Sequence, residues 1–109
     1  MVKLDVVVSN QNLAAVTEAL QDLGYRGLTV TEVSSAPDPD ESARRYRGRS
    51  MVAARRGVRI EVVIPSRRIE EALDMLQNTV GADAGHIVVS PVTDAVRIRT
   101  GERGEDAVE

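Results

Sequence analysis

The order of patterned segments along the chain is the feature that most constrains its fold. Short β-branched segments typical of strands occupy residues 2–8, 28–33, 58–64 and 87–89. Apolar residues recur at helical spacing over 13–23 and 69–80. The order is therefore strand, helix, strand, an unpatterned stretch, and then strand, helix, strand again. This order predicts an α+β, ferredoxin-like βαββαβ domain.

The length of 109 residues fits one domain spanning residues 1–109. The chain has no Phe and no Trp, so its core must be built from Val, Leu, Ile and Ala. Two helices cover only one face of such a sheet. Val7 and Val63 fall on the other face, and apolar residues there favour burial against partner subunits. We therefore expect an oligomer.

Composition excludes several function classes. The chain has no Cys, and His86 is its only histidine, which excludes disulfides, thiolate catalysis and a multi-His metal site within one subunit. No Gly-x-Ser-x-Gly motif supports nucleophilic catalysis, so we expect a protein that is not an enzyme. The net charge of -3 argues against nucleic-acid binding. Without a leader-like start or an apolar run near ~20 residues, the chain is expected to be cytoplasmic.

The stretch from residue 34 to residue 57 has no core-facing pattern. It opens with serine, proline and aspartate and continues with six arginines: Arg44, Arg45, Arg47, Arg49, Arg55 and Arg56. Loops this long are uncommon in compact domains and are usually functional or disordered. Its charges could bind a partner protein or remain solvated.

Three features could carry binding chemistry. If 96–99 is strand-like, Arg97 and Arg99 point to one side, roughly 6–7 Å apart, which suits a di- or triphosphate. The alternative is an arginine face paired with Asp or Glu. Gly85 and His86 follow small residues whose amides could approach a phosphate, although an ordinary loop explains them as well. Glu61 could bind a ribose hydroxyl or form an ion pair.

Four segments resemble the PII family of nitrogen-regulatory signalling proteins. They are Gly27–Val33, Tyr46–Gly48, Val58–Pro65 and, above all, the C-terminal run Arg97–Ala107. The resemblance implies a ferredoxin-like homotrimer that binds ATP or ADP in clefts between subunits, with Mg²⁺ as an accompanying ion. It also implies that residues 34–57 are the family's T-loop, which docks onto a membrane transporter or a metabolic enzyme, and that residues 93–109 are its C-terminal segment.

The resemblance assigns roles to particular residues of this chain. The nucleotide-binding residues that it implies are Thr29, Glu61, Val63, Gly85, His86, Arg97, Arg99 and Thr100. The partner-binding residues of the T-loop are Arg44, Arg45, Tyr46, Arg47 and Arg49.

Departures from the family pattern concern two other signals, 2-oxoglutarate binding and uridylylation. The family's Gly-x-Gly-Arg-Gln-like loop entry reads Ser35–Pro39 here, and its 2-oxoglutarate lysine falls at Gly57, where Arg55 or Arg56 could take its place. The uridylylated tyrosine of some members falls at Met51. We therefore expect a nitrogen-side regulator that keeps the adenine-nucleotide cleft, with 2-oxoglutarate a doubtful ligand. Alternatives are a carbon-side relative sensing AMP, ADP, a cyclic nucleotide or bicarbonate, a metal-tolerance trimer, or a slow ATPase.

Overall fold

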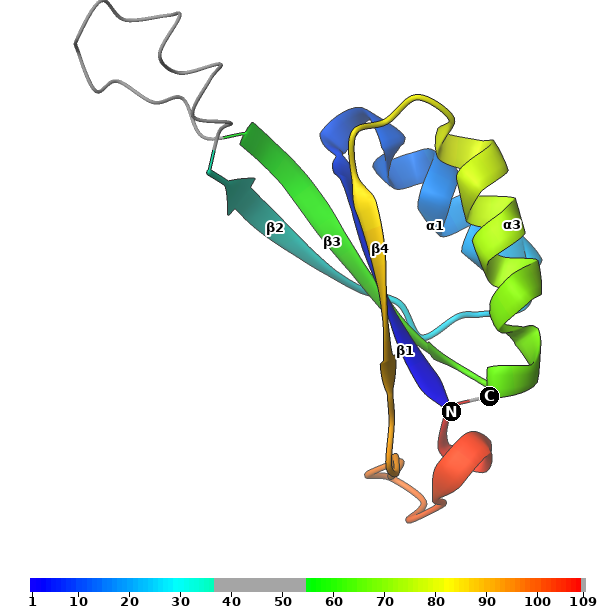
Figure 1. Ribbon diagram of the computed structural model, residues 1–109. Coiled ribbons are helices and arrows are strands. Elements are labelled where there is room, and N and C mark those ends of the chain that lie inside the picture. The colour runs from blue at the N-terminus through cyan, green and yellow to red at the C-terminus, as the bar shows by residue number, and fades with distance from the viewer. Residues whose placement is uncertain (37–54, 109) are drawn as a thin grey trace, which may run out of the picture.

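A four-stranded antiparallel sheet carries two helices on one of its faces (Figure 1). The computed structural model describes residues 1–36 and 55–108, so the proposed partner-binding residues of the T-loop lie outside it. The strands are β1 (Val2–Ser9), β2 (Thr29–Ser35), β3 (Arg55–Ile64) and β4 (His86–Pro91). The helices are α1 (Leu13–Asp22) and α3 (Ile69–Val80), with 3₁₀ turns η1 (Asn10–Asn12), η2 (Ser66–Arg68) and η3 (Gly104–Ala107). The arrangement confirms the predicted α+β, ferredoxin-like fold.

The strand order is β2-β3-β1-β4, so β1 is paired on both sides. Val2 lies opposite Ile64 of β3 and Pro91 of β4, and the antiparallel register continues along the strand from there. β2 pairs only with β3, from Thr29 opposite Glu61 to Ser35 opposite Arg55. This register fixes which side chains share a face of the sheet.

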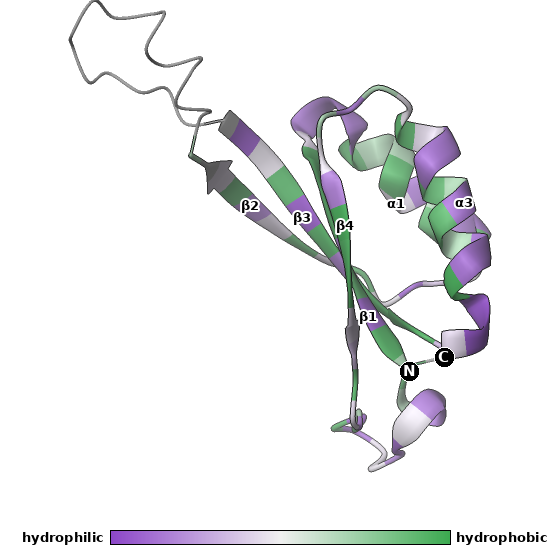
Figure 2. Ribbon diagram, viewed as in Figure 1, coloured by the Kyte–Doolittle hydropathy of each residue, from purple (hydrophilic) through white to green (hydrophobic). Residues whose placement is uncertain are grey.

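The core lies between the sheet and the two helices. Alternate residues of β1 and β3 are buried in it, together with residues of α1 and α3. Figure 2 shows hydrophobic positions along these strands and both helices. The core residues of these elements are Leu4, Val6, Val8, Val16, Leu20, Val58, Ile60, Val62, Ile64, Ala72 and Leu76. Burying each large aliphatic side chain contributes roughly 1.5–3 kcal/mol. The core is thus aliphatic, as the composition predicts, except for the buried ring of Tyr25.

The face of the sheet turned away from the helices mixes apolar and charged residues. Val7 and Val63 are half-buried there, and Val88, opposite Asp5, is 48% exposed. Register also places Thr29, Glu61 and His86 on this face, because Thr29 lies opposite Glu61 and His86 lies opposite Val7. The sheet thus presents several of the predicted nucleotide-binding residues on one open surface.

The strands bordering the long loop extend further than the sequence pattern predicts. Ser34 and Ser35 belong to β2, and residues 55–57 belong to β3, so the predicted loop bounds of 34 and 57 both fall inside strands. Backbone pairing holds these ends together, since Ser34 lies opposite Arg56 and Val33 lies opposite Gly57. Within residues 1–36 and 55–108, neither helix has the length and apolar content that crossing a bilayer requires.

Candidate functional site

A pocket of about 650 Å³ opens between the end of α1, the end of β3 and the C-terminal segment. Its lining residues are Gly24, Tyr25, Arg26, Gly27, Val62, Val63, Arg97, Ala107 and Val108. Two of the predicted nucleotide-binding residues, Val63 and Arg97, therefore meet in one place. The pocket combines apolar walls with two guanidinium groups, a composition that suits a ligand with an apolar body and an anionic end.

The helix end beside the pocket is shaped by Gly24, which adopts a φ of 98° that favours glycine. The Tyr25 amide donates to the Leu20 carbonyl at 3.0 Å and the Gly24 amide to Gln21 at 2.9 Å, the kind of closure that follows a left-handed residue after a helix. Tyr25 is consequently buried, and the Arg68 guanidinium lies 4.7 Å from its ring centroid. This stacking holds one wall of the pocket in place.

The segment carrying Arg97 and Arg99 is a hairpin rather than the strand that its alternating pattern predicts. Val96 forms an isolated bridge with Arg103, the Arg97 amide donates to Glu102 at 2.9 Å, and the chain turns over residues 98–100. The prediction that Arg97 and Arg99 share one side of a strand is therefore wrong. Gly101, with a φ of 75°, lets the chain reverse instead. Arg97 is on the hairpin stem, whereas Arg99 and Thr100 are exposed in the turn.

The side chain of Arg97 is paired within its own hairpin. Its Nη1 lies 3.4 Å from Glu102 Oε1, and the two side chains are 39% and 45% exposed. The same kind of pairing occurs on β3, where Arg59 Nε lies 3.1 Å from Glu61 Oε1 as an ion pair without hydrogen-bond alignment. For the arginines and for Glu61, the sequence allowed either ligand binding or an ion pair within the chain, and these ion pairs are present. The paired groups are partly exposed, so an anionic or hydroxylic ligand can still reach them.

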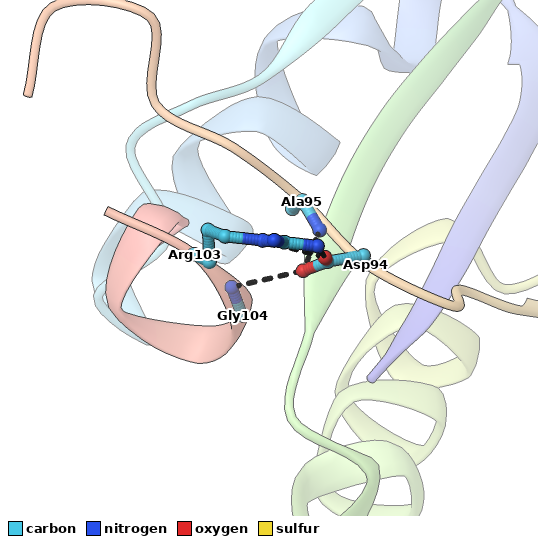
Figure 3. A network of polar contacts seen from close by, with 4 residues as sticks. All are labelled: Asp94, Ala95, Arg103 and Gly104. Carbon is cyan, nitrogen blue, oxygen red and sulfur yellow. Dashed lines mark hydrogen bonds and ion pairs between the residues drawn. The ribbon is translucent and has the colours of Figure 1, made fainter. Parts of the chain in front are cut away.

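Asp94 closes the base of this hairpin (Figure 3). Its Oδ1 accepts hydrogen bonds from the amides of Ala95 at 2.9 Å and Gly104 at 3.2 Å. Its Oδ2 accepts from Arg103, at 2.9 Å from Nε and again from Nη2. The hydrogen bond from Arg103, followed by the one from the Ala95 amide, holds the pKa of Asp94 below its usual range. The carboxylate thus stays charged and joins both stems of the hairpin.

The Gly85–His86 turn is tightly packed against β1. A Cβ atom on Gly85 would lie 1.9 Å from the Val7 carbonyl oxygen, so only glycine fits there. The Gly85 amide donates to Asp83 Oδ1 at 2.8 Å. The amide that the sequence suggests for a phosphate is therefore already bonded to a carboxylate of the same turn.

Asp83 also ties this turn to the end of β1. Its Oδ2 accepts from Ser9 Oγ at 2.8 Å, from the Ser9 amide at 3.1 Å and from Asn12 Nδ2. Burial raises the pKa of Asp83, but the hydrogen bonds from Ser9 and Asn12 outweigh it and the net shift is downward. Ser9 lies opposite Gly57, so the turn, the end of β1 and the described base of the T-loop adjoin one another.

Two groups of predicted site residues lie at opposite ends of β4, where Figure 1 shows the loop before the strand and the segment after it. Val63 and Arg97 line the pocket at one end, whereas Thr29 and Glu61 lie in the middle of the sheet, in the same row as Asp5 and Val88. Gly85 and His86 lie at the other end. The hairpin that carries Arg97 follows the far end of β4, so roughly 20 Å of strand separates Arg97 from the Gly85–His86 turn within one chain.

Among the residues that sequence patterns do not single out for these sites are Arg26, Asp83 and Asp94. Arg26 directly precedes the Gly27–Val33 segment, which is the only sequence signal for it. The two aspartates are in polar loops, where a carboxylate usually indicates a solvated surface. Across the described parts of the chain, no three His, Asp or Glu side chains gather into a group that could hold a metal ion.

Comparison with known proteins identifies the family. The model of the family "Nitrogen regulatory protein P-II" matches residues 1–102. The P-II proteins of Cereibacter sphaeroides and Azospirillum brasilense are 39% and 37% identical to the chain, each over 99% of this chain and 100% of its own length. The P-II protein of Haemophilus influenzae is 34% identical over the same shares. The chain thus belongs to the nitrogen regulatory protein P-II family, whose members are regulatory signalling proteins rather than enzymes.

Proposed function

We propose that this protein is a homotrimeric regulator in nitrogen metabolism that binds ATP or ADP in clefts between subunits. Nucleotide occupancy then sets the conformation of the T-loop, which controls a partner transporter or enzyme. The protein acts by binding and release rather than by turnover.

The observation that carries this proposal is the meeting of Val63 and Arg97 in one pocket of about 650 Å³. Its volume is in the usual range for small-molecule sites. Val63 and Ala107 offer apolar surface to a base, while the guanidinium of Arg97 offers two parallel donors to a phosphate. A phosphate carries more charge than the Glu102 carboxylate, so it can displace Glu102 from Arg97.

The separation of the two groups supports a site shared between subunits. One nucleotide cannot contact both Arg97 and the Gly85–His86 turn of the same chain across roughly 20 Å of strand. A neighbouring copy that packs on the open face, where Val7, Val63 and Val88 provide apolar surface, would bring its own turn to the Arg97 pocket. Closed cyclic symmetry then gives equivalent clefts.

At the described base of the T-loop, position 57 does not fit the family's 2-oxoglutarate lysine. The family's lysine for this ligand falls at Gly57, where an added Cβ would lie 2.6 Å from the Val8 carbonyl oxygen. A lysine at this position requires β1 or β3 to move, and no lysine occurs elsewhere in the chain except Lys3. This supports a sensor that responds to nucleotide alone.

Asp83 favours a second candidate, a sensor of nucleotides with fewer phosphates, such as ADP, AMP or a cyclic nucleotide. Its carboxylate accepts the hydrogen bond of the Gly85 amide and places a negative charge at the turn. This charge disfavours a long phosphate chain there. Such a preference fits the carbon-side relatives considered above.

Calorimetric titration with Mg-ATP, Mg-ADP and AMP, each with and without saturating 2-oxoglutarate, tests the proposal. We expect ATP or ADP to bind, Arg97→Ala to weaken binding roughly 10- to 100-fold, and 2-oxoglutarate to change nothing. Preference for AMP would support the second candidate. Absence of binding by every nucleotide would overturn both candidates. In a separate turnover assay, phosphate release from ATP above the Arg97→Ala background would show an ATPase.

A further inference from the structure

The hairpin that presents Arg97 has little to hold it in shape other than polar contacts. It stands beyond the end of β4, Ile98 at its tip is 100% exposed and Val96 is 56% exposed. Its stem has the Val96–Arg103 bridge and backbone hydrogen bonds from Arg97 to Glu102 at 2.9 Å, from Gly101 to Arg97 at 2.8 Å and, at the base, from Gly104 to Ala95 at 2.9 Å. With few apolar contacts, such a segment opens easily unless its base is fixed.

Asp94 and Arg103 fix that base. Asp94 accepts from Ala95 on the incoming stem and from Gly104 on the outgoing stem, while Arg103 reaches back to the same carboxylate (Figure 3). Hydrogen bonds to a carboxylate are stronger than those between neutral groups. The Asp94 side chain therefore adds contacts to both stems beside the single backbone hydrogen bond from Gly104 to Ala95.

The same contacts set the opposite wall of the pocket. Gly104 adopts a φ of 70° and begins η3, whose last residue Ala107 lines the pocket together with Val108. Because the Gly104 amide donates to Asp94, the start of η3 is tied to the hairpin base. On the far side, η3 is held to η2 by Arg67 Nη1, which lies 3.1 Å from Glu105 Oε2.

Neither Asp94 nor Arg103 lines the pocket, and Arg103 is 71% exposed. Val96 and Arg103 are bridge partners, so the next pair, Arg97 and Glu102, points to the other side of the hairpin. We propose that Asp94 and Arg103 form a positioning clamp, which presets the Arg97 guanidinium and the η3 wall for nucleotide without touching it. This inference rests on the proposed nucleotide site.

The clamp is tested by calorimetric titration of Mg-ADP into the full-length oligomer carrying Asp94→Ala, Arg103→Ala or both changes. We expect affinity to fall about tenfold for Asp94→Ala, which removes all four bonds, and about three- to fivefold for Arg103→Ala. The double variant is expected to match Asp94→Ala, because the two residues act as one unit. Asp74→Ala, on the exposed surface of α3, is the matched control and should bind like the parent.

Amide hydrogen exchange without nucleotide supplies a readout that does not depend on binding. In Asp94→Ala, exchange should quicken at the amides of Arg97 and Gly101 and stay unchanged in β1 and β3. Arg97→Ala separates the two proposals. If Arg97→Ala loses binding while Asp94→Ala keeps affinity within twofold and leaves hairpin exchange unchanged, the clamp is wrong and the nucleotide site stands. If Arg97→Ala binds normally, the nucleotide site itself is wrong.

Discussion

At the scale of single residues, two aspartates organise the ends of the sheet. A charged carboxylate has about four acceptor positions, so it can satisfy several donors where the chain turns. Asp83 collects donors from Ser9, Asn12 and Gly85, and Asp94 collects donors from both stems of the C-terminal hairpin. Both carboxylates have a lowered pKa, because these donors favour the charged form.

The depressed pKa of Asp83 makes part of the stability depend on pH. A carboxyl whose folded pKa lies below its unfolded value near 4 stabilises the fold above that value, and the contribution is lost as pH falls through the folded pKa. Asp83→Asn should therefore destabilise the protein at pH 6, and the difference from the parent should shrink as pH falls below about 4. Urea unfolding at fixed protein concentration measures this.

The matched control for this experiment is Asp74→Asn, which changes the same group on the exposed surface of α3. Its stability difference from the parent should be small at every pH. A difference between Asp83→Asn and the parent that stays constant from pH 6 to pH 3 would show that the hydrogen bonds to Asp83 do not favour its charged form.

These aspartates also mark the limit of what the sequence predicts at this scale. Asp83 bonds to Ser9, 74 positions earlier, and nothing local distinguishes that carboxylate from a solvated one. Val63 and Arg97, in contrast, are predicted as site residues through the family motif, and they do line one pocket. Long-range polar contacts depend on the finished fold and leave no periodic signal.

At the scale of elements, hydrophobic periodicity predicts strands and helices that bury one face. It does not predict segments that are held only by backbone hydrogen bonds. The strand over 2–8 and the helix over 69–80 agree with β1 and α3 because each buries one face. The start of β3 is missed, since its first three residues pair through the backbone without an apolar pattern. The alternating apolar and charged residues over 96–99 predict a strand. The segment is a hairpin instead, because Gly101 allows the chain to reverse and Asp94 bonds to both stems.

Gly57 offers a test of how closely β3 approaches β1. Gly57→Ala should destabilise the protein by about 1–3 kcal/mol, because its Cβ would lie 2.6 Å from the Val8 carbonyl oxygen. Gly27→Ala is the matched control, since an added Cβ there meets nothing within 4 Å. Chemical unfolding of both variants measures the difference.

The lysine variant extends the same test to ligand choice. Gly57→Lys is expected to lose stability like Gly57→Ala and to gain no response of nucleotide affinity to 2-oxoglutarate. A stable Gly57→Lys protein in which 2-oxoglutarate tightens Mg-ATP binding would contradict the account of β3 given above.

At the scale of the whole molecule, the proposed nucleotide site is divided between the two ends of the sheet. The Arg97 pocket and the Gly85–His86 turn have complementary roles in the proposed nucleotide site, yet β4 separates them. The open face carries apolar residues that a second copy can cover. The central claim is therefore that each nucleotide is bound by the pocket of one subunit and the turn of another.

Subunit mixing tests this claim most directly. Arg97→Ala and His86→Asp subunits, each expected to bind Mg-ADP at least tenfold more weakly alone, are co-expressed, and mixed oligomers are isolated with distinct tags and titrated. A shared cleft predicts that about one site in each mixed trimer regains parental affinity, because one interface joins two intact halves. If mixed trimers bind no better than either variant alone, or if His86→Asp alone binds normally, the shared site is wrong.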